Sequence, residues 1–263
     1  MAKFPIEAIL KVLEEPKQVK EDKRDYGSSG HTGDKYKLFA EWHLKAAYIL
    51  KYKFPNRLKV HIDLTAGPYF DDKGDRNVLA GAVRSYQKAE VWADTVCVAI
   101  ESDRARYDRL VAGLRSDGVL APDGYAETGK VVAVCALFSD VVFRPIVHGA
   151  CGEACFDPTP GLKACRDAVT INEIVPKSFS ISSYIGVTIH NRMAKAESVH
   201  YGRDGQDRTA ETMRSALQGT RKYGHKSAKY GRCGGQVNVF TDARSKIPRF
   251  FPLGAFTQHE LFP

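Results

Sequence analysis

Runs of consecutive apolar residues alternate along the chain with segments in which apolar residues recur every three or four positions. Continuous apolar runs are typical of strands buried in a parallel sheet, and the longer spacing is typical of helices packed on such a sheet. The strand-like runs are 60–63, 95–100, 130–138, 154–156, 179–191, 236–242 and 250–256. The helical segments are 34–52, 77–89 and 102–114. This pattern predicts an α/β fold: a doubly wound, seven-stranded, mostly parallel sheet whose last two strands form a closing antiparallel hairpin.

The first strand-like run ends in Asp63 and passes directly into a turn of small residues, Thr65-Ala66-Gly67. In an open parallel sheet, ligands bind beyond the carboxyl ends of the strands. A tight turn there leaves backbone N–H groups free, and a carboxylate can accept hydrogen bonds from ribose hydroxyls. A turn of this kind also occurs in sheets that bind nothing, so a purely structural turn is the alternative interpretation.

The second strand-like run, 95–100, ends in Glu101. The connection between two parallel strands is right-handed, so we expect Glu101 and Asp63 to lie side by side at the strand ends. A carboxylate in this position suits a ribose diol. The alternative is that Glu101 complements the dipole of the helix expected over 102–114.

The run 154–156 ends in Asp157, which is followed by Pro158, Pro160 and a glycine. Proline fixes φ and removes a donor, so this turn would hold Asp157 rigidly where a substrate must be met. The alternative is a proline-rich loop in which Asp157 bonds only its own backbone.

Together, the acids that end these three runs resemble the class I S-adenosylmethionine-dependent methyltransferase fold. More narrowly, the chain resembles the three-Cys-motif partner family of that superfamily. The resemblance spans roughly residues 30–192 and rests on four motifs. They are His31-Thr32 with Lys35, the run from Ile62 to Pro68, Ile100-Glu101, and Phe156-Asp157-Pro158 with Gly161.

The resemblance implies S-adenosylmethionine as the cofactor and assigns a role to each motif residue. Asp63 and the turn after it would hold the methionine part, Glu101 the ribose and Asp140 the adenine edge. His31 and Lys35 would close over the cofactor, although a helix that only packs explains the apolar stripe of 34–52 equally well. The implied cofactor-binding residues are His31, Lys35, Asp63, Thr65, Ala66, Gly67, Glu101 and Asp140, and the implied catalytic residues are Asp157 and Pro158.

Two motifs depart from the patterns they resemble. The family typically has Asp-x-Phe-Ala-Gly-Pro-Gly at the first strand end, whereas here Thr65 replaces the Phe and Tyr69 replaces the last Gly. A side chain at that last position would narrow the cofactor pocket. Amino methyltransferases that act on bases often carry an acid-Pro-Pro-aromatic turn. Here Thr159 stands at the second proline and no aromatic follows.

Positive charge is concentrated in one part of the chain. Residues 190–250 contain 13 Lys and Arg against 5 Asp and Glu, a net charge of +8 that equals the charge of the whole chain. Basic residues interleaved with aromatics suit phosphate contact and base stacking, which predicts a nucleic-acid partner, DNA or RNA. A solvated loop that keeps the protein soluble is the alternative. The candidate contacts are Arg192, Arg221, Lys222, Tyr223, Lys226, Lys229, Tyr230 and Arg232.

Length and composition predict one α/β domain with appendages. Of 263 residues, 43% are hydrophobic, enough for one sizeable core. We expect an N-terminal amphipathic helix over 5–15 and a linker in 1–33, then a methyltransferase-like domain over 34–263 with a basic insertion at about 195–235. No apolar stretch approaches the roughly 20 residues that cross a bilayer, and the N-terminus lacks the pattern of a signal peptide. A cytoplasmic protein without a membrane partner is the expectation.

The six cysteines predict reduced thiols, because Cys97, Cys135 and Cys155 fall in or beside strand-like runs. Cys151, Cys155 and Cys165 cluster near His148, but their spacing fits no zinc pattern. We therefore expect no metal site.

The sequence leads to the hypothesis of an S-adenosylmethionine-dependent methyltransferase that acts on nucleic acid, at an amino group of a base. The alternative is a catalytically inactive protein of the same fold that binds nucleic acid or a protein partner. A dehydrogenase on the same sheet is a weaker possibility, because no G-x-G-x-x-G follows the first strand.

Overall fold

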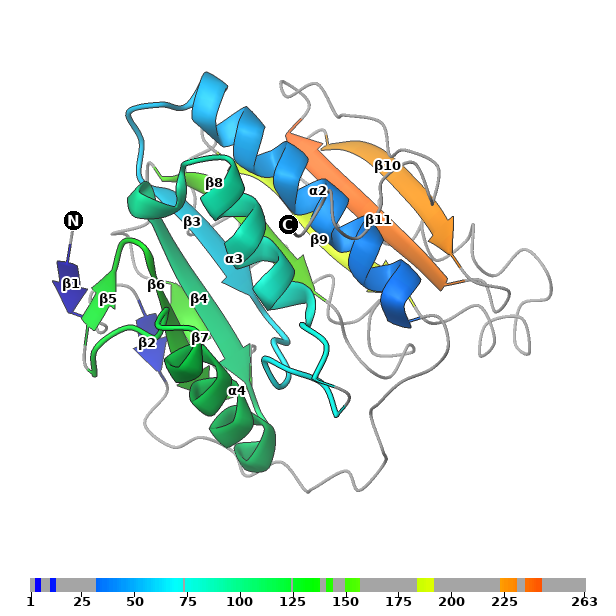
Figure 1. Ribbon diagram of the computed structural model, residues 1–263. Helices are drawn as coiled ribbons and strands as arrows, with labels where there is room; N and C mark the ends of the chain where they lie inside the picture. Colours follow the sequence, from blue (N-terminus) through cyan, green and yellow to red (C-terminus); the bar gives the residue numbers. More distant parts are fainter. Residues whose placement is uncertain are drawn as a thin grey trace.

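A seven-stranded sheet forms the centre of the protein (Figure 1). The computed structural model describes residues 3–5, 10–12, 32–72, 74–123, 125–137, 141–143, 150–156, 184–191, 223–230 and 235–242. The sheet order is β10-β11-β9-β8-β3-β4-β6. The bounds are β3 Lys59–Asp63, β4 Thr95–Glu101, β6 Lys130–Cys135, β8 Cys151–Phe156, β9 Tyr184–Asn191, β10 Tyr223–Tyr230 and β11 Gly235–Asp242. The strands from β6 to β9 are parallel, and β11 is antiparallel to both β9 and β10.

The described helices lie on the same face of this sheet (Figure 1). They are α2 Thr32–Lys53, α3 Val78–Lys88 and α4 Arg104–Ser116, and a short 3-10 helix, η1, spans Trp92–Asp94. Asn77 and Asp103 cap α3 and α4 by accepting backbone hydrogen bonds, as these residue types usually do at helix starts. The prediction of helices on the opposite face concerns residues outside the described ranges.

Two small antiparallel pairs flank the sheet. β1 Lys3–Pro5 pairs with β5 Tyr125–Glu127, and β2 Leu10–Val12 pairs with β7 Val141–Phe143. The helix predicted over 5–15 is therefore contradicted at residues 10–12, which form a strand; residues 6–9 and 13–15 lie outside the described ranges. Its amphipathic pattern fits either structure locally, and the choice depends on strand partners more than a hundred residues away.

The central strands could be predicted from the sequence because they are buried along their whole length. Every residue of β3 and β4 is buried. The first half of α2 packs Leu38, Phe39 and Trp42 against Val78 of α3 and Cys155 of β8. The core thus lies between α2, α3 and the centre of the sheet, directly behind the carboxyl ends of β3 and β8.

The helix predicted over 34–52 is confirmed, with a different start. It begins at Thr32, so Asp34 lies within its first turn and does not cap it. Of the cysteines, Cys97, Cys135, Cys151 and Cys155 are free thiols, as predicted for the reduced state. None of the described helices has the length and apolarity that a membrane span requires.

The closing antiparallel hairpin exists, but the sequence assigned one of its strands wrongly. β11 has β9 on one side and β10 on the other, so 250–256, which lies outside the described residues, is not its hairpin partner. β10 falls within the segment predicted as a basic insertion at about 195–235. Its polar sequence, YGHKSAKY, lacks the apolar pattern from which strands were predicted. An edge strand tolerates charged residues, and lysine especially, that a central strand does not.

Candidate functional site

The chain order of the parallel strands reverses beside β3. Counted from β6, each next strand comes earlier in the chain as far as β3 (β6-β4-β3). The two strands on the other side of β3, which are β8 and then β9, come later in the chain. In open α/β sheets this reversal opens a crevice beyond the carboxyl ends of the strands, and ligands bind in it. Asp63 ends β3 and Glu101 ends β4, so both of these predicted site residues lie at the reversal.

Hydrogen bonds to both neighbouring strands hold the turn after β3. The N–H of Leu64 donates to the carbonyl of Cys155 on β8 at 2.9 Å, and the N–H of Ala66 donates to the carbonyl of Ile100 on β4 at 2.9 Å. Within the turn, the N–H of Thr65 donates to Oδ1 of Asp63 at 3.1 Å. Gly67 follows with φ +65°, a conformation that side chains disfavour. The predicted residues from Asp63 to Gly67 therefore form one fixed turn.

Glu101 joins this turn to the second strand end. Its Oε2 accepts from the N–H of Gly67 at 3.0 Å, and its Oε1 accepts from the N–H of Asp103 at 2.8 Å. A carboxylate offers about four acceptor positions, more than the neighbouring backbone N–H groups occupy, so acceptor capacity remains for a ligand. The carboxyl group is buried, which raises its pKa despite the lowering effect of the backbone N–H groups. The alternative interpretation, in which Glu101 interacts with the start of the following helix, also has support, because Asp103 directly precedes α4.

Asn77 is a site residue that the sequence interpretation did not single out. Its Nδ2 donates to the carbonyls of Ala66 at 2.7 Å and Pro68 at 2.8 Å, while its Oδ1 accepts from the N–H of Ala80. One side chain thus caps α3 and fixes the turn after β3. The signal available in the sequence was an asparagine directly before a helix, which indicates a cap but not the second contact.

Tyr69 is packed in the core. The side chain is fully buried in a cluster with Leu110 and Leu114 of α4, and its ring meets Phe70 edge-on at 5.1 Å between centroids. A Cβ placed on Gly113 would lie 2.6 Å from the Cβ of Tyr69, so the missing side chain of that glycine makes room for the tyrosine. The Tyr69 ring thus belongs to a part of the core that joins α4 to Ala66 of the turn.

The remaining predicted cofactor and acceptor residues are placed only in part. Lys35 is buried in α2, with Nζ 5.1 Å from the centroid of the Tyr36 ring. β6 ends at Cys135, earlier than predicted. The predicted site residues outside the described ranges are His31, Asp140, Asp157 and Pro158.

The predicted nucleic-acid contacts fall at the far edge of the sheet. β11, β9 and β8 separate β10 from β3. Tyr223, Lys226, Lys229 and Tyr230 lie in β10, of which the main chain is described. Arg192, Arg221, Lys222 and Arg232 lie outside the described residues.

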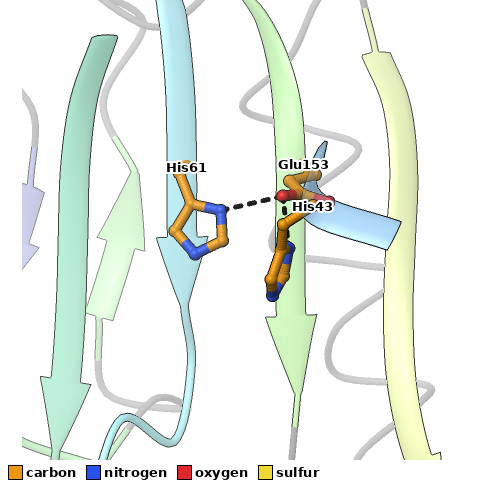
Figure 2. Close-up of side chains that lie close together, drawn as sticks. All are labelled: His43, His61 and Glu153. Carbon is orange, nitrogen blue, oxygen red and sulfur yellow. Dashed lines mark hydrogen bonds and ion pairs between the residues drawn. The ribbon is translucent and has the colours of Figure 1, made fainter. Parts of the chain in front are cut away.

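A second polar cluster, also missed in the sequence, lies inside the protein behind the strand ends (Figure 2). It consists of His43, His61 and Glu153, all buried, whose ligand-type atoms lie within 4.8 Å of one another. Such side chains can hold a metal ion. Here both Nδ1 atoms contact Oε1 of Glu153, and a metal ion on them would leave each Nε2–H without the acceptor that ligating histidines usually have. The arrangement favours a hydrogen-bonded ion cluster.

Comparisons with known proteins give a likeness of fold. No family model and no curated protein matches the sequence. Protein LPL1258 from Legionella pneumophila is 10% identical with a TM-score of 0.51, over 81% of this chain and 86% of that one. The fold is Rossmann-like. Lower-scoring similar structures include cofactor-bound Rv0187 from MTB (12% identity, TM-score 0.47, 82% and 87% covered) and the plantazolicin methyltransferase BpumL with SAH (8%, 0.43, 80% and 85%).

Proposed function

We propose that this protein is an S-adenosylmethionine-dependent methyltransferase. The observation that carries the proposal is the Glu101 carboxylate at the reversal of the Rossmann-like sheet. It is bonded by the N–H groups of Gly67 and Asp103 and has acceptor positions left over. The mostly parallel sheet with a closing antiparallel hairpin, as the apolar pattern of the sequence predicted, supports the same conclusion.

The residues at the strand ends fit the parts of this cofactor. Glu101 accepts hydrogen bonds from the ribose hydroxyls, and Asp63 with the turn up to Gly67 holds the methionine part. As the resemblance implies, we assign the adenine edge to Asp140 and the closing of the cofactor site to His31 and Lys35. The cofactor supplies an activated methyl group, so the protein mainly has to align the acceptor and exclude water.

Ligand binding tests the proposal directly. Titration of the full chain with S-adenosylmethionine or S-adenosylhomocysteine is expected to show one saturable site, and NAD is expected to show none. A ligand at a hundred times its Kd stabilises the folded state by about 2.7 kcal/mol. For a chain of this size that raises the melting temperature by roughly 5 to 10 °C. Stabilisation by NAD alone would point to a dehydrogenase, and no stabilisation by either methyl-donor ligand would contradict the proposal.

For the acceptor, we propose an amino group of a nucleic-acid base. The concentration of basic residues in 190–250 supports a phosphate-bearing partner. Asp157, directly after β8, would accept a hydrogen bond from the amino group, with Pro158 stiffening the turn. Binding of nucleic acid without methyl transfer to any strand would favour the inactive binding protein.

The basic segment can be tested by point variants that leave the sheet intact. Deleting residues 201–235 would remove β10, so the double variant Lys226→Gln, Lys229→Gln is the better choice. We expect it to weaken binding of single-stranded DNA and RNA and to lower the slope of log affinity against log salt by about 2, since each lost phosphate contact lowers it by about 1. The matched control Lys53→Gln, Lys88→Gln removes the same charge elsewhere. An equal loss in both variants would show that only net charge matters.

A further inference from the structure

One carboxylate oxygen inside the protein joins three elements. Oε1 of Glu153, on β8, lies 2.6 Å from Nδ1 of His43 on α2 and 3.2 Å from Nδ1 of His61 on β3. The hydroxyl of Tyr86 on α3 donates to the same oxygen at 3.3 Å. In Figure 2 the ring of His61 lies to the left of the Glu153 carboxylate and the ring of His43 lies below it. The fractional exposure of all four residues is 1% or less.

The charge of Glu153 decides the direction of these hydrogen bonds. Burial alone raises its pKa, but the charge and hydrogen bonds of His43 and His61 lower it more, so its pKa is well below the usual range. Glu153 is therefore an ionised carboxylate, which only accepts. Both histidines then carry a proton on Nδ1. Burial also raises the pKa of Tyr86, so its hydroxyl keeps the proton that it donates.

Each of these three elements also carries or contacts a residue of the candidate cofactor site. His61 precedes Asp63 by two residues on β3, on the same side of the strand and about 7 Å away. Tyr86 lies on α3, whose cap Asn77 holds the turn at Ala66. His43 lies on α2, which also carries Lys35. A single side chain of β8 therefore contacts all three elements.

We propose that Glu153 is a positioning residue for the cofactor site, an inference that rests on the proposed function. It sets the spacing of β3, α2 and α3, and with it the relative placement of Asp63, the turn and the start of α2. Without the negative charge, all three buried hydrogen bonds to the shared oxygen weaken together, and each element can relax separately. Displacements of about 1 Å in a ligand site can cost on the order of a hundredfold.

The test compares two variants that lower the melting temperature but differ in location. Glu153→Gln keeps the shape of the side chain and removes its charge. Val96→Ala empties a buried position near the amino end of β4, at the opposite end of that strand from Glu101. S-adenosylmethionine affinity is measured by calorimetry at a temperature where both variants are folded. We expect a 10- to 100-fold loss for Glu153→Gln and less than about threefold for Val96→Ala.

The outcomes distinguish a failure of the proposed function from a failure of the positioning role alone. If the wild-type protein binds no S-adenosylmethionine, the proposed function fails and the positioning role falls with it. If the wild type binds but Glu153→Gln binds equally well, or no worse than Val96→Ala, only the positioning role is overturned. Should Glu153→Gln fail to fold, Tyr86→Phe removes one donor and keeps the packing. It is then expected to weaken binding and to speed amide hydrogen exchange at Gly67, and unchanged values of both would overturn the inference.

Discussion

Replacing Glu101 with glutamine is expected to weaken S-adenosylmethionine binding by about a hundredfold while leaving the fold intact. The glutamine keeps the size of the side chain, but it puts an NH₂ group against either the Gly67 or the Asp103 N–H, each of which now donates to a carboxylate oxygen. Hydrogen bonds to a charged group are worth about 1.5 to 3 kcal/mol, and 1.4 kcal/mol corresponds to a factor of ten. Losing the charge toward two ribose hydroxyls therefore accounts for about two orders of magnitude.

The pH dependence of binding gives this prediction an independent readout. Because burial raises the pKa of Glu101 above its usual value of 4.5, the carboxyl gains a proton earlier than an exposed glutamate as the pH falls. The protonated group loses acceptor capacity, so wild-type affinity should decline as the pH falls through the raised pKa. Glu101→Gln should show no such decline.

A matched control is available in Glu127→Gln, a similarly buried glutamate in β5, outside the strand ends of the main sheet. Calorimetry should give wild-type affinity for this control. Equal affinity in Glu101→Gln and wild type would show that the pocket is assigned to the wrong strand ends.

Replacing Gly152 with alanine is expected to cost at least about 4 kcal/mol of unfolding free energy, which places it among the most damaging single substitutions. A Cβ on Gly152 would overlap the carbonyl oxygen of Val60 on β3 and lie 2.7 Å from its carbonyl carbon. Both are main-chain atoms of the central strand pair, so no side-chain rotation relieves the clash. β8 would have to move away from β3 and break the pairing of Val60 with Gly152.

Urea denaturation and the yield of soluble protein measure this effect. Gly33→Ala is the matched control, because a Cβ there has nothing within 4 Å and the residue lies in the first turn of α2. Alanine is favoured over glycine in a helix by roughly 0.5 to 1 kcal/mol, so the control should be neutral or slightly stabilising. Gly152→Ala with wild-type stability would mean that β3 and β8 do not approach so closely.

Gly152 adjoins Glu153, and the pairing of β8 with β9 shifts register between them. Bulges of this kind re-aim side chains and often occur next to functional sites. The close approach at Gly152 therefore keeps β8 near β3 at the level where Glu153 meets His61.

The sequence by itself determined the central strands and the acids at their ends. Strands of a parallel sheet are buried on both faces, so 95–100 reads as a nearly continuous apolar run, and 60–63 combines Val60 and Ile62 with two polar residues. A carboxylate that ends such a run must fall at the carboxyl ends of the strands. Asp63, the turn to Gly67 and Glu101 were predicted on this basis, because their positions depend only on where their own strands end.

Only the tertiary structure decided the features that depend on partners far along the chain. β2 and β10 are strands because they pair with β7 and β11, and neither has the apolar pattern of a buried strand. The direction of Tyr69 follows from the space above Gly113. His43 and Glu153 meet across 110 residues because α2 packs against β8. A polar residue in a buried run indicates that a partner is needed, but the identity of the partner follows from register and packing, which no local pattern contains.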